Sequence, residues 1–577
     1  MKLWIGALGA LAGTGVFGVA IAACSSPLGP TCGVDFNCAD DAAADGVAAD
    51  GMTGDGAGDA NGDQSTTDGG GDGPSDAPME TTVSCDASTA ITCNGQCVDS
   101  TQPAHCGSCT NVCTAPTHGQ ATCTAPSTCG ITCDATYHAC NGNCLPDSNE
   151  PSMDACVVSD ALGVFVAPTG SDTTGCGTKA LPCQTIGKGL AVAKVAGKRT
   201  YVCEGTYNEQ LVVDATLDGA KVFGGFACGT WTYDANRKPK VLLSAGGYAM
   251  VVSTPTSALF EDFAFEAKSA MTAGESSIAV FAKSAMGVVL RRCNVTAGAG
   301  VAGQDRTQGS PYASAAPNGV NGTAVGGGTL VVNPACTLST SGVGGGPAVS
   351  GQDGTDGAPG SSNKGTMVAC QSTGLGGGPG AGGTSGADGA GASTWATFNS
   401  SGWSPSWGSS GGYGVVGQGG GGGASVDLSG GGGSGGAGGC GGAGGSAGTG
   451  GGSSITLLAF SSSVDVEMCT LTSNNGGRGG NGATGQVGQT GGTKGNGFAN
   501  ACQAGKGGNG GSGGTGGGGS GGLSAGVVWL GTAPTVNGTA TPSAATLSGV
   551  TIGALGAGGT GATTGKAGVA AAVVQFQ

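Results

Sequence analysis

Residues 430–451 read GGGGSGGAGGCGGAGGSAGTGG, and glycine occupies every third position from Gly430 to Gly451 without interruption. The same spacing returns at 374–389, 476–491 and 507–522. A period of three belongs to neither the α-helix nor the β-strand, but it is the repeat of the polyproline II helix. A glycine at each turn leaves one edge bare, so neighbouring segments can pack backbone to backbone. These tracts therefore predict bundles of glycine-edged extended segments.

The alternative interpretation of the glycine tracts is a slack linker. Glycine loses more conformational entropy on ordering than any other residue, and glycine-rich chains commonly behave as flexible coils. Proline is almost absent from these tracts, with Pro379 inside one of them and Pro359 shortly before it, so a proline-stabilised triple helix of three chains is not expected. The sequence alone does not decide between the ordered bundle and the slack linker.

Composition separates this chain from ordinary globular enzymes. It has 577 residues, 128 glycines, 5% aromatic and 10% charged residues, with a formal net charge of -16. No Lys or Arg occurs between Lys2 and Lys179, whereas residues 179–577 hold 19 basic and 16 acidic residues. The nearly neutral C-terminal part has no basic stripe that could neutralise phosphates, which argues against nucleic acid as a partner.

The first 23 residues have the layout of a secretory signal, with Lys2 followed by an apolar run at 3–20. The ending Ile21-Ala22-Ala23-Cys24 resembles the lipobox of bacterial lipoproteins. That resemblance implies cleavage before Cys24 and attachment of diacylglycerol to its thiol and a fatty acyl chain such as palmitate to its amine. Ser25 in place of an aspartate favours the outer membrane. We therefore expect an exported protein, lipid-anchored through Cys24 at the bacterial outer membrane or cell surface.

Residues 24–84 are rich in Asp, Ala, Gly, Ser and Thr, with an aspartate roughly every four or five positions. Such a segment buries too little apolar area to order itself, so it predicts an acidic, disordered tether. The D-x-D-x-D spacing of a calcium loop is absent, and we expect no metal there. Cys32 and Cys38 are expected to close one small loop.

Residues 85–156 hold twelve cysteines, at positions 85, 93, 97, 106, 109, 113, 123, 129, 133, 140, 144 and 156. An even number in an exported chain predicts a disulfide module. CNGQC at 93–97 recurs as CNGNC at 140–144, which indicates an internal duplication. HCGSCTNVC at 105–113 resembles the repeats related to the plant stigma-specific protein, a resemblance that implies no catalysis. A zinc site formed by Cys106 and Cys109 with the three histidines, His105, His118 and His138, is the alternative interpretation.

From residue 161 to 577 the composition changes to β-forming segments. The stretches 164–194, 200–213 and 221–226 resemble the opening of right-handed parallel β-helices of the pectin-lyase-like superfamily. The interpretation places a first strand at 164–167, a helix at 186–193 that covers the open end, and a tight corner at Gly205-Thr206-Tyr207. Further strands are expected at 248–253, 259–266, 277–282 and 287–295. Candidate disulfides here join Cys176 to Cys183 and Cys203 to Cys228.

A long-range repeat connects this scaffold to the glycine tracts. Residues 276–300 and 453–477 both read as strand, turn and strand with a cysteine, Cys293 or Cys469, followed by glycine; 524–559 is a looser copy. The chain is therefore expected to leave an all-β scaffold in excursions at about 296–452, 474–523 and 553–568 and to rejoin it each time. These excursions are similar to the repeats of PE-PGRS proteins, without the PE domain. Candidate disulfides join Cys336 to Cys370 and Cys440 to Cys502.

Candidate catalytic residues are sparse. Glu261-Asp262 and Arg291-Arg292 are adjacent within expected strands, so the members of each pair should face opposite ways. Residues 161–577 contain no histidine and the glycine runs lack the Gly-Lys-Ser/Thr ending of a phosphate loop. We therefore expect no enzyme activity, no metal and no cofactor. The alternative is a carbohydrate-active enzyme of the pectin-lyase-like kind.

One aromatic cluster lies within the glycine region, at Trp395, Trp403, Trp407 and Tyr413. Exposed aromatics often mark binding sites, so these four are candidates for stacking on sugar rings. The competing interpretation is that they fill the junction between excursion and scaffold. The sequence thus predicts a structural or adhesive surface lipoprotein that contacts extracellular polysaccharide or other cells, with ice binding as a third hypothesis.

Overall fold

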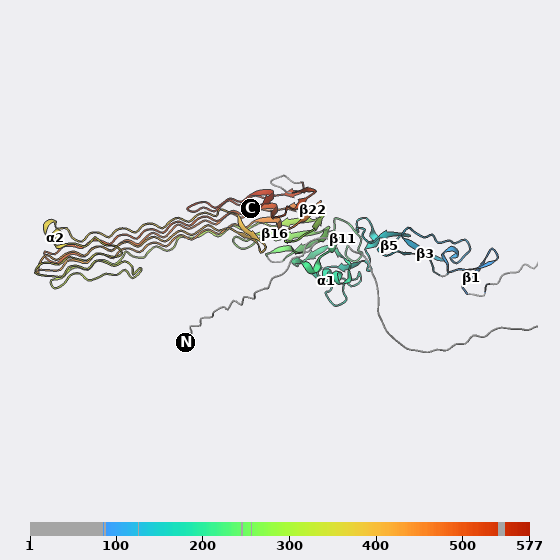
Figure 1. The fold of residues 1–577 in the computed structure, drawn as a ribbon, viewed down its shortest axis with the longest axis horizontal. Helices are drawn as coiled ribbons and strands as arrows, with labels where there is room; N and C mark the ends of the chain where they lie inside the picture. The colour runs from blue at the N-terminus through green and yellow to red at the C-terminus, as the bar shows by residue number, and fades with distance from the viewer. Residues whose placement is uncertain (1–84, 86–87, 125, 244–245, 255–256, 541–547) are drawn as a thin grey trace, which may run out of the picture. The chain divides into compact units, whose positions relative to one another are not determined.

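The computed structural model describes residues 85–577 except 86–87, 125, 244–245, 255–256 and 541–547 (Figure 1). The predicted signal peptide at 1–23, the acylation site Cys24, the tether at 24–84 and the loop between Cys32 and Cys38 lie outside these residues. The described chain is mainly β-strand, together with glycine-rich segments that are neither helix nor strand. No helix among the described residues combines the length and the hydrophobicity that crossing a bilayer requires.

Residues 85–156 form three antiparallel hairpins joined by disulfides. The hairpins pair β1 (Ala90–Cys93) with β2 (Gln96–Asp99), β3 (Gly119–Thr124) with β4 (Thr128–Cys133), and β5 (Tyr137–Cys140) with β6 (Asn143–Pro146). The disulfides join Cys85–Cys97, Cys93–Cys109, Cys106–Cys123, Cys113–Cys129, Cys133–Cys144 and Cys140–Cys156. All twelve cysteines of this module are therefore oxidised.

The duplication read from the sequence extends to turn geometry and disulfide pairing. Asn94-Gly95 and Asn141-Gly142 each have two positive φ angles, which a two-residue hairpin turn of this type needs. The cysteine before each turn pairs with one 16 residues later. The cysteine after each turn pairs with one 12 residues earlier in the first copy and 11 residues earlier in the second.

The strands from residue 163 onward form three sheets, which together we call the three-sheet body. The first sheet contains β7 (Gly163–Val166), β8 (Arg199–Cys203), β11 (Ala220–Phe226), β14 (Ala258–Glu261), β17 (Val288–Arg291), β22 (Val464–Glu467), β25 (Thr535–Val536) and β26 (Thr539–Ala540). The second contains β9 (Gly205–Tyr207), β12 (Pro239–Leu242), β15 (Ala264–Ala267), β18 (Asn294–Ala297), β23 (Thr470–Thr472) and β27 (Val550–Thr551). The third contains β10 (Leu211–Val213), β13 (Tyr248–Ser253), β16 (Ser277–Lys283), β21 (Ser454–Phe460), β24 (Ser524–Leu530) and β28 (Ala570–Gln575).

Neighbouring strands in these sheets are parallel, apart from β26, which is antiparallel to β25. From β8 onward the chain visits the first, second and third sheets in turn, so that β11, β12 and β13 are followed by β14, β15 and β16. Each circuit places one strand beside its predecessor in every sheet. The sequence repeat at 276–300 and 453–477 therefore corresponds to successive circuits of one scaffold.

The inward faces of the sheets carry stacked apolar side chains. In the first sheet the register aligns Val222, Phe260, Leu290, Val466 and Val536, one residue from each successive strand. All five are buried in one core cluster. Burial of aligned large side chains in every circuit is the main stabilising contribution to this stack.

The corner between the first and second sheets is built by residues with left-handed backbone. Asp262 has φ +61° and Arg292 has φ +52°, and Met468 and Asn537 occupy the same corner of later circuits with φ of 51° and 48°. The sequence predicted single strands at 259–266 and 287–295, and this was wrong. Each is two strands in two sheets, because the chain turns sharply at Asp262 and at Arg292.

The N-terminal end of the body agrees with the sequence interpretation in its helix and disulfides. Helix α1 (Ile186–Ala196) begins at the cap Thr185, whose hydroxyl accepts the Lys188 N–H, and packs its buried face into the core beside β7. The predicted disulfides Cys176–Cys183 and Cys203–Cys228 are present. The expected tight corner at Gly205-Thr206-Tyr207 is instead strand β9.

Three glycine-rich segments, at 298–453, 473–523 and 552–569, form what we call the glycine array. Each leaves the body after a strand of the second sheet and returns into the third sheet, at β21, β24 and β28 respectively. Figure 1 shows the segments running alongside one another, with α2 (Met367–Thr373) at the end remote from β16. All three segments leave the body after the second sheet and return into the third sheet, so segments that are far apart in sequence become neighbours.

Backbone hydrogen bonds at three-residue intervals join the segments of the array. Along 433–451, the N–H of every third residue donates to a carbonyl of 502–520, from Gly433 to Cys502 through Gly451 to Ser520. Segments 408–423 and 477–498 donate with the same spacing to carbonyls of 431–452. The slack-linker interpretation is therefore wrong for these segments. Their N–H and C=O groups are paired with neighbours, as buried backbone requires.

The three-residue spacing has a steric cause. A Cβ added at Gly441 would lie far inside van der Waals contact with the Gly414 carbonyl oxygen, and one at Gly442 with the Gln486 carbonyl oxygen. The third row of the same segment accepts small side chains, such as the buried Ser434 and Ala437. Glycine is thus favoured on the rows that face neighbouring backbones, and it occupies every position of the Gly442 row from Gly430 to Gly451.

Two disulfides cross-link the glycine array, and both differ from the sequence expectation. Cys336 pairs with Cys440, and Cys370 of α2 pairs with Cys502. The expected pairs Cys336–Cys370 and Cys440–Cys502 joined cysteines that lie closer in sequence. Segments from different excursions pack side by side, so spatial neighbours in the array are remote in sequence.

Candidate functional site

The predicted aromatic cluster lies on a hairpin that covers the outer face of the third sheet. Strands β19 (Ala396–Asn399) and β20 (Gly402–Pro405) pair antiparallel within the longest excursion. Phe398 of this hairpin is buried in a cluster with Leu458 of β21 and Val528 of β24. The hairpin thus brings Trp395, Trp403 and Trp407 to the place where the array meets the body.

Two of the four candidate aromatics are packing residues. The Trp403 ring lies 5.5 Å from that of Phe576 and 6.0 Å from that of Phe398, measured between ring centroids. The Trp395 indole donates to the Ala567 carbonyl oxygen at 2.8 Å, and the Lys566 ammonium lies 4.0 Å from its ring centroid. Both indoles therefore hold the hairpin against the end of the chain, and their faces are largely covered.

The other two candidates are open to solvent. Trp407 is 63% exposed and Tyr413 is 79% exposed. Trp407 lies two residues after the end of β20, and Tyr413 lies farther along the same segment of the array. The structure therefore divides the predicted cluster into two rings that pack and two that can contact a partner.

An open pocket of about 530 Å³ lies beside Trp407. Besides the indole, it is lined by the hydroxyl residues Ser393, Thr394, Thr397, Ser404, Ser406 and Ser409. None of the described residues that line it carries a charge. An aromatic face beside several neutral donors and acceptors suits an uncharged, hydroxylated ligand.

Some of these hydroxyls are held in place. The hydroxyls of Thr394 and Ser406 lie 2.8 Å apart, and the Ser409 hydroxyl accepts the Ala390 N–H at 2.7 Å. These bonds fix the orientation of the groups around the indole. The pocket is therefore preorganised on ordered backbone, which lowers the entropic cost of binding.

The charged pairs of the body converge, contrary to the expectation that they face opposite ways. Asp262 and Arg292 lie in the left-handed corner, so each turns back toward its neighbour. Arg292 donates to Asp262 at 2.9 Å and contacts Glu261, and the Tyr233 hydroxyl donates to Asp262 at 2.7 Å. Lys238 also lies 3.2 Å from Asp262. Neighbouring side chains of a strand point to opposite faces, but this rule does not apply here because the strands end at this corner.

The contacts of this charged cluster join the cysteine-rich module to the body. Burial raises the pKa of Glu261, and burial also raises the pKa of Tyr233. Hydrogen bonding to Asp262 raises the pKa of Arg292. The pKa shifts of Tyr233 and Arg292 lead away from neutral pH. Arg291 contacts Glu150 of the cysteine-rich module as well as Glu261. The cluster connects the module to the body through paired charges.

The cysteines of the alternative zinc site are not free ligands. Cys106 is bonded to Cys123 and Cys109 to Cys93, so neither can supply a thiolate to a metal. The zinc interpretation of Cys106 and Cys109 with the three histidines is therefore wrong for this oxidised module. His138, one of those histidines, instead lies 3.2 Å from Asp147 and 3.0 Å from Asp154, two neighbours that the sequence did not indicate.

Two buried thiols occupy matching positions in successive circuits. Cys293 and Cys469 are free, and the Cys293 N–H donates to the Cys469 sulfur at 3.1 Å. Burial raises the pKa of the Cys293 thiol. The sequence repeat had aligned these two cysteines, and the parallel register of β18 with β23 places them side by side.

Comparison with protein-family models, with curated proteins and with solved structures finds no match to this chain. The resemblances to lipoprotein signals, to the stigma-specific repeats and to pectin-lyase-like β-helices therefore stay predictions from residues 21–24, 105–113 and 164–226. The geometry described above is the basis for assigning a function.

Proposed function

We propose that this chain is a surface-anchored structural or adhesive lipoprotein that presents an ordered glycine-rich surface to extracellular polysaccharide or other cells. In this proposal the three-sheet body is a right-handed parallel β-helix. The repeated visiting order of the three sheets supports it, and parallel crossovers are right-handed in nearly all proteins. The glycine array is a bundle of polyproline II segments, which its three-residue hydrogen-bond spacing supports.

The observation that carries the proposal is the ordered attachment of the array. Its segments are bonded to one another at three-residue intervals and cross-linked by Cys336–Cys440 and Cys370–Cys502. Both ends of each segment are fixed in adjoining strands of the body. A long glycine-rich segment without this support would be a flexible coil. The arrangement suits a rigid display surface, on which Trp407 and Tyr413 are exposed.

Export and anchoring are supported by cysteine chemistry and by the N-terminal sequence. Ten disulfides join cysteines within the described residues, a number typical of proteins that fold in an oxidising compartment. The motif at Ile21–Cys24 provides the acylation site. We therefore place the protein at the outer membrane or cell surface, held by lipid at Cys24.

The pocket beside Trp407 indicates the kind of surface that is contacted. Its lining of hydroxyls and one exposed indole has no charge to attract an ionic ligand. A neutral polysaccharide offers both hydroxyls and the apolar faces of its rings, which match this lining. Contact at repeated glycan units would multiply a weak single interaction.

The test is sedimentation of the full-length acylated protein in detergent with insoluble cellulose or chitin. We expect the wild-type protein to sediment with at least one of these glycans and the Trp407→Ala variant to bind about tenfold more weakly. Leu375→Ala is the matched control, because Leu375 is exposed to a similar extent, 62%, and does not line the pocket. Unchanged binding by Trp407→Ala would show that the glycan does not bind at this pocket.

The same incubation separates adhesion from the enzyme alternative. An adhesin leaves the glycan intact, so no reducing ends and no unsaturated products should accumulate. Steady product release from either glycan, or from a panel of acidic polysaccharides, would instead establish a carbohydrate-active enzyme. Sedimentation without turnover supports the adhesive function.

A further inference from the structure

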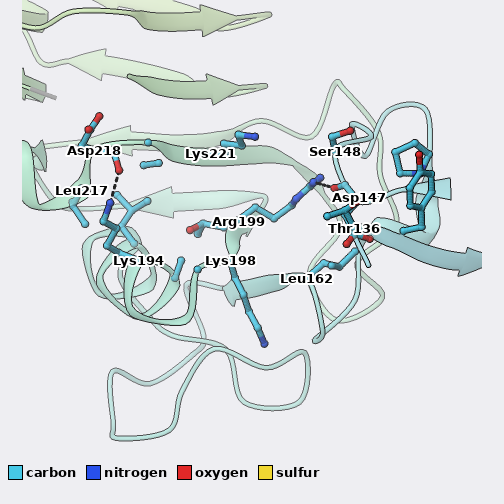
Figure 2. Close-up of a pocket in the computed structure, with 18 residues that line it drawn as sticks. Thr136, Asp147, Ser148, Leu162, Lys194, Lys198, Arg199, Leu217, Asp218 and Lys221 are labelled. Atoms are coloured by element: carbon cyan, nitrogen blue, oxygen red, sulfur yellow. Dashed lines mark hydrogen bonds between the residues drawn. The ribbon is translucent and has the colours of Figure 1, made fainter. Parts of the chain in front are cut away.

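A second, larger pocket lies where the last hairpin of the cysteine-rich module meets the N-terminal end of the body (Figure 2). Its volume is about 820 Å³, which is within the range of small-molecule sites. The walls come from β5 and β6 of the module, from the last turn of α1, from the start of β8 and from the connection between β10 and β11. Segments far apart in sequence thus converge on one cavity.

The lining of this pocket carries more positive than negative charge. Four basic residues line it, Lys194, Lys198, Arg199 and Lys221, against two acidic residues, Asp147 and Asp218. The module contributes no basic residue, since no Lys or Arg occurs between Lys2 and Lys179. All of the positive charge therefore comes from the body side of the pocket.

The basic side chains are held by main-chain carbonyl groups. Lys194 donates to the Asp218 carbonyl oxygen at 2.6 Å, and Lys198 donates to that of Asp160 at 2.7 Å. Arg199 donates to the carbonyl oxygen of Asn149 at 2.7 Å and contacts that of Asp147. Carbonyl groups orient a cation but carry no net charge, so its positive charge is not neutralised.

Seven basic residues outside the pocket form ion pairs with carboxylates: Arg237, Lys238, Lys240, Arg291 and Arg292 of the body, and Lys364 and Arg478 of the array. Within the described residues, none of the four basic residues of the pocket forms such a pair. The pocket therefore concentrates unpaired positive charge in a partly enclosed space, where it attracts anions most strongly.

The pocket also has an apolar wall. Leu162, Leu190 and Leu217 line it beside the basic residues. In Figure 2 the Lys198 side chain extends away from Lys221, whereas Arg199 lies between Lys194 and Asp147. The groups available to an occupant are thus Lys194, Arg199 and Lys221, with an aliphatic surface next to them.

We propose that this pocket binds a small ligand that bears an oxyanion group, a carboxylate or a sulfate, on a compact body. Lys221 holds the oxyanion by a charge-assisted hydrogen bond, Lys194 and Arg199 add positive charge to the same pocket, and the leucine wall contacts the rest of the ligand. The ligand touches both the module and the body, so its binding stabilises their association. The inference goes beyond adhesion, because no residue of the glycine array lines this pocket.

The test is isothermal titration of the full-length protein with three probes of similar size: D-glucuronic acid, D-glucose 6-sulfate and D-glucose. We expect at least one acidic probe to bind and the uncharged sugar not to bind. Lys194→Gln and Lys221→Gln should each weaken binding about tenfold, and both effects should shrink as salt is added. Lys506→Gln is the matched control, because Lys506 is an exposed lysine of the array that does not line the pocket.

Each outcome decides the proposal. Binding of glucuronic acid alone, or of the sulfated sugar alone, supports it and identifies the oxyanion. The proposal is overturned if neither acid binds, if glucose binds as tightly as the acids, or if Lys194→Gln and Lys221→Gln bind like the Lys506→Gln control. Thermal unfolding of each variant in the absence of probe shows whether folding has been preserved. A loss of binding in a variant that unfolds at the wild-type temperature is therefore a loss of the site.

Discussion

The Arg291 Nε on β17 donates a 2.7 Å hydrogen bond to the Glu467 Oε2 on β22, although 176 positions of sequence separate the two residues. They are direct register neighbours in the first sheet. Between them the chain completes the longest excursion of the glycine array and returns to the next place in the stack. Arg291 also contacts Glu261 and Glu150, so one side chain connects three successive circuits of the body and the cysteine-rich module.

Replacing Arg291 should therefore destabilise the body. Arg291→Met keeps the aliphatic bulk but removes the charge, which weakens the compensation of the buried Glu261. We expect the free energy of unfolding to fall by about 2 kcal/mol, as measured by denaturant unfolding, because the buried Glu261 keeps only Arg292 as a partner among the described residues, and Glu150 and Glu467 lose their contact with Arg291. Lys240→Met is the control. Lys240 pairs with Glu266 at the surface and should cost less than about 1 kcal/mol. Equal losses in the two variants would contradict this account of Arg291.

Cys293 and Cys469 should be inert in the folded protein. Both thiols are buried, so neither is in contact with the reagent. Burial also raises the pKa of Cys293, whereas hydrogen bonding with Cys293 lowers the pKa of Cys469, so the protection of Cys469 depends on its burial alone. Alkylation by iodoacetamide at pH 8, followed by peptide mass spectrometry, should leave both unmodified in the native protein and label both after denaturation without reductant. The disulfide-bonded cysteines should stay unlabelled throughout. Labelling in the native state would contradict the stacked arrangement, and no labelling after denaturation would show that the two thiols are joined.

An ion pair on the array predicts a pH-dependent contribution to stability. Hydrogen bonding to Arg478 lowers the pKa of Asp305 from its ordinary value of 3.8 to about 2. A carboxyl whose pKa is lower in the folded state stabilises the fold above its unfolded value and loses this contribution as the pH falls through its folded value. Asp305→Asn should therefore lower the Tm at pH 6, have a smaller effect near pH 2, and leave the Tm unchanged near pH 1. Both side chains are nearly half exposed, so the shift in Tm should be small.

Arg478→Gln provides the matching control for Asp305. It removes the other partner of the same pair, so its Tm difference from wild type should show the same dependence on pH. A constant Tm difference at every pH would indicate lost packing and would contradict an electrostatic origin.

The sequence predicted the strands better than it predicted their corners. The strand at 248–253 and the helix that begins at 186 could be predicted from apolar patterning, because burial dictates those residues. The breaks at Asp262 and Arg292 could not, because neither residue is a type that favours a left-handed backbone strongly enough to indicate a turn. Their conformation is imposed by stacking on the next circuit, where the Asp262 N–H donates to the Arg291 carbonyl oxygen at 3.0 Å.

The cysteine pairs of the array show a second limit of sequence reasoning. Cys176–Cys183 and Cys203–Cys228 could be predicted because short loops bring their partners together. Cys336–Cys440 and Cys370–Cys502 span 104 and 132 residues, and their pairing depends on which segments lie side by side in the array. Glycine spacing predicts that segments pack, but every tract has the same spacing. The choice of neighbour is therefore not encoded in the repeat.

The close approach of segments in the array gives the sharpest prediction. Gly442 lies on a row where a Cβ would collide with the Gln486 carbonyl oxygen, and that oxygen already accepts the Gly513 N–H at 2.9 Å. Gly442→Ala must separate three segments or break this bond, so we expect a loss of about 2 kcal/mol in the free energy of unfolding and a lower Tm.

Gly382→Ala is the matched control for this substitution, because it adds the same methyl group in the same array. The nearest heavy atom to a Cβ at Gly382 is the Asn509 carbonyl oxygen at 3.7 Å, an ordinary contact. This variant should be as stable as wild type, or more stable by about 0.5 kcal/mol because alanine restricts the unfolded chain. Thermal unfolding followed by circular dichroism compares the two directly. If Gly442→Ala were tolerated as well as Gly382→Ala, the segments could not be packed backbone to backbone, and a rigid display surface would lose its physical basis.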